Sequence, residues 1–196
     1  MTASTVAGIN RHRGTDRIGA NQNMTDEAAG DDGQTITVDD PRYLAMHERA
    51  KGTNVNEQTL LATDYLNHFN EVVMLLEMIP DMPDMLDEAK EWKPKSYKDH
   101  FLDSSIADRE LAVEAYDFVP TKFKAPFEQT ISQLNRLVAS SLARLEQDLI
   151  DGNLDLAREN ASALSGTLQR LTDVAGGIIH GSERSMDQSE IDTLLG

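Results

Sequence analysis

The chain has 196 residues, no cysteine and a formal net charge of −16. This length allows one medium domain with tails, and the missing cysteine excludes disulfides and thiolate chemistry. The acidic charge argues against nucleic-acid and anionic-membrane surfaces, which reward Lys and Arg, and no run approaches the ~20 apolar residues of a membrane-spanning helix. We therefore expect a cytoplasmic protein with protein partners, no nucleic acid and no membrane.

The first part of the chain, residues 1–38, is rich in Gly, Ala, Thr, Asn and Asp and shows no sustained periodicity. This composition predicts a disordered tail. The sequence Asp-Asp-Pro at 39–41 then supplies a helix cap and a proline suited to a first turn, and Gly52 can end the helix. We predict a short helix over 41–51 at the start of a helical domain that spans 39–175.

The most apolar segment follows Asn56 and continues to residue 79. Its apolar side chains recur at three- and four-residue steps, which predicts a helix over 56–79 that is central to the fold. Pro80 and Pro83 end this pattern, and shorter helical segments follow. No segment alternates with period two for long enough to be a strand, so we predict an all-α, elongated helical bundle.

Residues 121–175 predict two long helices joined by a turn at 151–153, which is an antiparallel helical hairpin. Gly152 can take the left-handed conformation that ends one helix, and Asn153 can cap the next. The apolar stripe of the second helix contains small residues such as Ala157 and Ala161, which let backbones approach closely. We therefore expect the hairpin to form a homodimer surface as well.

Two sets of side chains have the chemistry of a metal site. His68 and Glu71 lie one turn apart on the predicted helix 56–79, although a histidine on this apolar stripe is more often a hydrogen-bonded core or interface residue. Four methionines follow at near-helical spacing, and Met more often serves core packing: Met74, Met78, Met82 and Met85. A helical metal-binding bundle therefore stays an alternative, and we expect no cofactor. His47, near a Lys-Gly pair, resembles the segment of phosphotransfer domains with the lysine shifted by one residue.

The chain closes with a predicted glycine-rich hinge at 176–186 and a peptide at 187–196. If Asp187 caps a helix, Glu190 falls at its third position, which is the spacing of a capping box. Ile191, Leu194 and Leu195 then form one apolar stripe. A helix of two turns is marginal alone, so we expect it to fold against a partner groove. The alternative is a terminal helix packed on the body.

This closing peptide resembles the Leu-Ser-Gln-x-Glu-Ile-Asp-Ala-Leu-Leu peptide of flagellar motor switch proteins of the FliM type, which binds the response regulator CheY. A similar peptide closes chemotaxis phosphatases of the CheZ type, which are dimeric helical hairpins. The resemblance implies that a CheY-like receiver domain binds these residues: Met186, Asp187, Gln188, Glu190, Ile191, Asp192, Leu194 and Leu195.

The resemblance also implies a rival function, a divergent phosphatase that acts on the aspartyl phosphate of the receiver. The phosphatase family uses an acidic residue and, one helical turn later, a glutamine that orients the attacking water. No glutamine of this chain has Asp or Glu four residues before it. We therefore carry over the binding peptide, predict no catalytic residue, and expect a non-enzymatic adaptor of bacterial chemotaxis or flagellar motility.

Overall fold

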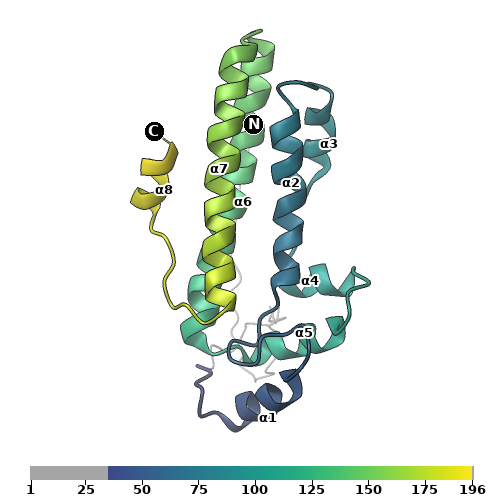
Figure 1. Cartoon of the computed structure of the whole chain (residues 1–196), viewed down its shortest axis with the longest axis vertical. Coiled ribbons are helices and arrows are strands. Elements are labelled where there is room, and N and C mark those ends of the chain that lie inside the picture. Colours follow the sequence, from purple (N-terminus) through teal and green to yellow (C-terminus); the bar gives the residue numbers. More distant parts are fainter. Residues whose placement is uncertain (1–34, 196) are drawn as a thin grey trace, which may run out of the picture. The chain divides into compact units, whose positions relative to one another are not determined.

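The computed structural model describes residues 35–195 (Figure 1). Within this range the chain is all-helical, with eight α-helices and no strand, which confirms the predicted all-α class. The elements, with η for a short 3₁₀ helix, are α1 (Pro41–Ala50), η1 (Thr63–Leu66), α2 (Asn67–Met78), α3 (Met85–Glu91), α4 (Tyr97–Leu102), α5 (Arg109–Ala115), η2 (Tyr116–Phe118), α6 (Thr121–Ile150), α7 (Leu154–Ile179) and α8 (Gln188–Leu195).

The two longest helices, α6 and α7, lie side by side and are joined by the turn at 151–153 (Figure 1). Gly152 adopts a φ of +70°, and the Asn153 side chain accepts a hydrogen bond from the first turn of α7. The facing apolar side chains, including Leu134 and Leu168, are fully buried. The apolar side chains that we expected to form a dimer surface are therefore largely buried within one chain.

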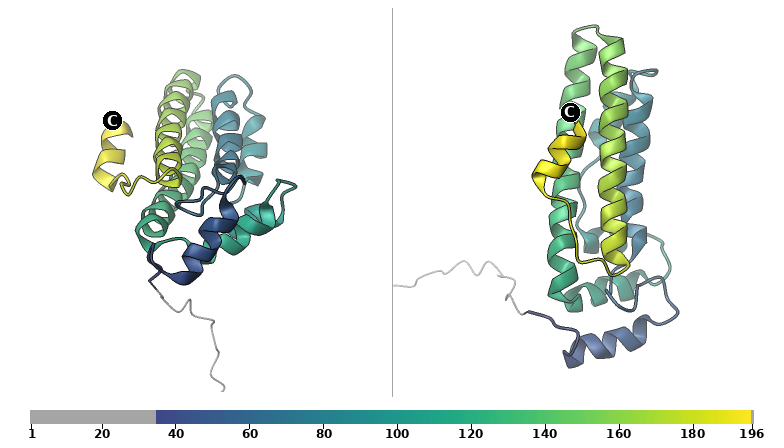
Figure 2. Two further views of the ribbon diagram at one scale, coloured as in Figure 1. Left: turned by 60° about the horizontal axis from the view of Figure 1, so that its bottom comes forward. Right: turned by 60° about the vertical axis from the view of Figure 1, so that its left-hand side comes forward.

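The other helices pack on this α6–α7 pair. α2 packs against α7, and α3 packs against both α2 and α6. Figures 1 and 2 show α8 on the side of the pair away from α2. The remaining helices, α1, α4 and α5, gather near the end of the pair where α6 begins and α7 ends (Figure 1). Among the longer helices, α8 packs mainly against α7.

The predicted helix over 56–79 is wrong in its first part, because residues 56–62 form an irregular, largely buried segment before η1 and α2. Leu60 has a φ of +62°, which no helix permits. The Thr59 hydroxyl donates to the carbonyl oxygen of Ile179 at 2.6 Å, and the Ala62 N–H donates to the Tyr97 hydroxyl at 2.8 Å. Tertiary hydrogen bonds therefore replace the local ones that the helical pattern favoured.

The predicted disordered segment, 1–38, lies mostly outside the described residues. At its end, however, Ile36 is 7% exposed and belongs to the core. Its N–H donates to the Thr121 hydroxyl at 3.1 Å, and the Thr121 N–H donates to its carbonyl oxygen at 2.9 Å. Ile36 is therefore part of the packed body, which the composition did not predict.

Candidate functional site

The segment that follows α7 carries the predicted binding peptide. α7 continues through Gly176 to Ile179, so the predicted hinge at 176–186 begins four residues too early. Gly181, two residues after the end of the helix, has a φ of +101°, and a Cβ there would approach Oε1 of the exposed Gln58 side chain to 2.9 Å. Because this φ strains any residue with a side chain, glycine is the residue that this exit from α7 favours.

A capping box starts α8, as the spacing of Asp187 and Glu190 predicts. The Glu190 N–H donates to Asp187 Oδ1 at 2.9 Å, and the Asp187 N–H donates to Glu190 Oε2 at 2.9 Å. The Arg184 guanidinium adds a hydrogen bond to the other Glu190 oxygen at 2.7 Å. Hydrogen bonds from the Glu190 backbone and Ser189 lower the pKa of Asp187. Local contacts therefore define the start of this two-turn helix.

The segment is also attached to the body of the protein. Ile191 is 3% exposed and joins the hydrophobic core. Upstream of it, Gln133 Nε2 on α6 donates to the Met186 carbonyl oxygen at 2.9 Å. A hollow of about 340 Å³ nevertheless remains between α7 and this segment. The buried Ile191, the partly buried Met186 and the Gln133 hydrogen bond therefore carry most of the docking. The ion pair of Lys122 with Glu183 is exposed and contributes little.

The structure separates the predicted site residues into an inner and an outer group. Ile191 points to the body, whereas Met186, Glu190 and Leu194 are half-buried. The exposed members lie on the outer side, with Gln188 Nε2 donating to Asp192 Oδ1 at 2.8 Å; they are Asp187, Gln188 and Asp192. Leu195 lies in the last turn of α8. A partner that uses Ile191 as an anchor must therefore displace α8 from the body.

His68, the strongest sequence candidate for metal or proton chemistry, stacks on Trp92 with ring centroids 4.6 Å apart. Its side chain is 6% exposed. Burial lowers the pKa of His68, and a hydrogen bond to the Lys93 backbone opposes this shift. Its Nε2 has no hydrogen-bond partner among the described residues. The surroundings are therefore mainly those of a core histidine.

The methionine series is not the core-packing element that the sequence indicated. Met74 is 61% exposed, Met82 is 46% exposed and Met78 is 37% exposed, whereas Met85 packs partly on the core. Over residues 35–195, no group of three or more His, Asp or Glu side chains is placed to hold a metal ion.

In that same range, no helix is both long and apolar enough to cross a bilayer. His47 binds the Glu57 carbonyl oxygen through Nδ1 at 2.8 Å.

Sequence reasoning missed the residues that hold the C-terminal segment to the body, above all Gln133. Gln133 is 5% exposed and follows the buried Thr130 on the inner side of α6. Two polar residues inside an apolar stripe indicate a tertiary hydrogen bond, because buried polar groups need hydrogen-bond partners. The partner itself lies 53 residues away, and no local pattern could identify it.

Comparisons with known proteins add no family assignment. No protein-family profile, curated protein or solved structure matches the chain. The residues and contacts described above are therefore the only basis for a functional proposal.

Proposed function

We propose that this protein is a cytoplasmic, non-enzymatic adaptor of bacterial chemotaxis or motility that binds a CheY-like receiver domain through its C-terminal peptide. The observation that carries the proposal is the capping box between Asp187 and Glu190, because it fixes the start of a short amphipathic helix at the end of a linker. Peptides of this kind bind by laying their apolar stripe into a groove. The resemblance of the peptide supplies the identity of the partner.

The proposed roles of the side chains follow from their chemistry. Ile191 and Leu194 enter the groove of the receiver and dominate affinity, since buried apolar anchors carry most of the energy of an interface. Glu190 and Asp192 meet basic residues at its rim and mainly affect association rate and salt dependence. Leu194 is half-buried in the docked segment, so this anchor can be tested with little disturbance of the body.

We further propose that the adaptor is an elongated bundle that dimerises through residues 121–175. Since Leu134 and Leu168 are buried within one chain, the dimer must use outward side chains of the α6–α7 pair. Ile150 and Leu154, at its tip, are 71% and 49% exposed and supply apolar area there. A native molar mass equal to one chain at micromolar concentration would exclude this dimer.

The test is a titration of a labelled receiver domain, with and without a phosphoryl mimic, against the full chain and two variants. Leu194→Ala should weaken binding by about 1–3 kcal/mol, and a chain that ends at Ser185 should not bind. The matched control is Leu44→Ala, which truncates an exposed leucine on α1 and should leave affinity unchanged. Equal affinity of all these chains would show that the peptide is not the binding site.

The same mixture tests the rival function. Phosphorylated receiver is followed as it loses its phosphoryl group, alone and with a stoichiometric amount of the full chain. An unchanged decay supports an adaptor. A substantial acceleration would replace the adaptor with a phosphatase, and a chain that ends at Ser185 would then show whether that activity needs the peptide.

A further inference from the structure

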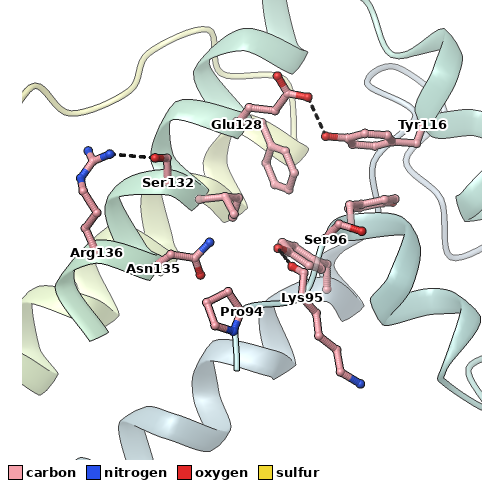
Figure 3. A pocket seen from close by; sticks show the side chains of 12 residues that line it. Pro94, Lys95, Ser96, Tyr116, Glu128, Ser132, Asn135 and Arg136 are labelled. Atoms are coloured by element: carbon pink, nitrogen blue, oxygen red, sulfur yellow. Dashed lines mark hydrogen bonds between the residues drawn. The ribbon is translucent and has the colours of Figure 1, made fainter. Parts of the chain in front are cut away.

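A pocket of about 400 Å³ opens between α6 and residues 94–97, and no residue of the C-terminal segment lines it (Figure 3). Its volume lies within the range of small-ligand sites. The pocket is lined by side chains from four elements and by residues 94–96. The four elements are η1 with Tyr65, α4 with Tyr97, η2 with Tyr116, and α6 between Phe127 and Arg136. Nothing in the proposed receiver contact uses this pocket.

The floor of the pocket is a set of buried rings. Tyr65 and Tyr97 lie 5.3 Å apart between ring centroids, and Phe127 lies 5.9 Å from the first and 6.0 Å from the second. All three are nearly fully buried. The Tyr65 hydroxyl donates to the Lys95 carbonyl oxygen, and the Tyr97 hydroxyl accepts from the Ala62 N–H. The rings are tilted against one another by 48° to 83° and their polar ends are occupied, so they form an uncharged apolar layer under the pocket. The half-buried Tyr116 and Ile131 supply the apolar surface that a ligand can reach.

Asn135 supplies an unsatisfied polar atom at one end of this floor. Its carboxamide points into the pocket between Pro94 and Ser132 (Figure 3). The Oδ1 atom is buried and accepts no hydrogen bond from any described residue. Buried acceptors are nearly always paired in folded proteins, so this position favours a ligand that brings an N–H or O–H donor.

Arg136, the next residue, supplies positive charge at the same end. Its Nη1 donates to the Ser132 hydroxyl at 2.8 Å, and it forms no ion pair with any described residue. The other basic group at the rim, Lys95, is already paired with Asp103 at 2.9 Å. Arg136 therefore keeps donors in the planar arrangement that suits a carboxylate.

The opposite end of the pocket carries the opposite charge. Glu128 accepts a hydrogen bond from the Tyr116 hydroxyl at 2.9 Å and lies two helical turns from Arg136 on α6. At 1.5 Å per residue, this separation is about 12 Å along the helix. A carboxylate is repelled at the Glu128 end and attracted at the Arg136 end, so the charges give a bound acid one orientation.

We propose that this pocket binds a small aromatic carboxylate that carries an N–H or O–H donor. The apolar body of the ligand packs against Tyr116 and Ile131, the carboxylate pairs with Arg136, and the donor satisfies Asn135 Oδ1. The apolar wall, the guanidinium without an ion pair and the unsatisfied acceptor each correspond to one of these contacts. The proposal is independent of the receiver contact, because no residue of the C-terminal segment lines the pocket.

Three indole probes separate these contacts in calorimetric titrations of the full chain. Indole-3-acetate has both the carboxylate and the ring N–H, 1-methylindole-3-acetate lacks the N–H donor, and tryptamine carries a cation in place of the carboxylate. Indole-3-acetate should bind with a dissociation constant of about 1 mM or below. Each of the other probes should bind about tenfold more weakly, since each loses a hydrogen bond or an ion pair.

Two variants assign the contacts to their residues. Arg136→Gln should weaken indole-3-acetate about tenfold and remove its advantage over tryptamine, whereas Arg170→Gln, at an exposed position of α7, should bind like the wild type. Asn135→Leu should remove the discrimination between the methylated and unmethylated acids. Equal binding of the three probes, full affinity in Arg136→Gln, or no saturable binding of indole-3-acetate at about 1 mM would each overturn the proposal.

Discussion

The docking of α8 should depend mainly on the side chain of Ile191. This residue is 3% exposed, and truncation to alanine removes three buried carbons at ~0.8 kcal/mol each, or about 2 kcal/mol in all. The linker keeps α8 attached whether it is docked or free, so this loss acts on local opening. A free-energy change of about 2 kcal/mol raises the equilibrium population of the open form about 30-fold.

Amide hydrogen exchange of α8 measures this opening, because exchange of a docked helix follows its local opening free energy. In the Ile191→Ala variant, the amides of α8 should exchange about 30-fold faster, whereas those of α6 and α7 and the melting temperature should hardly change. Leu102→Ala is the matched control, since Leu102 is 62% exposed on α4 and the change also removes three carbons, without loss of burial.

Two results would refute this argument. If the α8 amides of the wild-type protein exchange as fast as those of a free peptide, the helix is not docked and Ile191 has no docking energy to lose. If Ile191→Ala instead lowers the melting temperature of the whole body by several degrees, the side chain belongs to the global core, and the C-terminal segment is a packed terminal helix.

Two further predictions concern the body. The pKa of His68 and that of His100 are lowered, chiefly because burial disfavours the charged ring. The folded form therefore binds fewer protons than the unfolded chain below about pH 6.5. The free energy of unfolding should keep its full value above about pH 6.5 and fall as the pH drops below it. Urea titrations should show a shallower pH dependence in His68→Phe than in the wild type; equal dependence would contradict this. Asp148, 4% exposed, accepts a hydrogen bond from Asn160 Nδ2 at 2.6 Å. Asp148→Ala should lower the free energy of unfolding in urea by about 1–3 kcal/mol. Glu159→Ala, at an exposed position of α7, is the control and should lower it by about 0.5 kcal/mol or less. Similar losses in both variants would show that the burial of the Asp148 carboxylate is not important for stability.

The sequence predicted helices well wherever their ends are set locally. The proline at position 41 and the side chain of Asp40 start α1, and Asn153 caps α7, as their residue types indicate. The prediction failed over 56–62, where the pattern is helical but Thr59 bonds to Ile179, 120 residues away. A hydrogen bond between such distant residues leaves no periodic signal, so tertiary structure overrode propensity there.

The candidate site shows the same division. The capping box of α8 follows from the three-residue spacing of Asp187 and Glu190, and it is present. The docking through Gln133 depends on a contact between elements far apart in the chain, and it could not be predicted. The aromatic floor of the pocket is a similar case, because Tyr65, Tyr97 and Phe127 come from three separate elements.

Docking on the body and binding to a receiver both use the side chain of Ile191, so the two compete. The proposed function can therefore be tested with substitutions in the body that leave the peptide unchanged. If only the open form binds a receiver, the apparent dissociation constant equals the intrinsic one divided by the open fraction. Gln133→Leu removes the hydrogen bond to the Met186 carbonyl oxygen, which is worth about 1 kcal/mol, and leaves the peptide unchanged.

The two variants that open α8 should therefore affect receiver affinity differently. Gln133→Leu should strengthen binding by up to about fivefold, because it enlarges the open fraction and keeps both anchors. Ile191→Ala should leave the apparent affinity nearly unchanged, because the larger open fraction is offset by the loss of the same side chain from the receiver groove. If both variants weaken binding although both accelerate exchange of α8, the receiver recognises the docked segment together with α6, and release of the helix is no part of recognition.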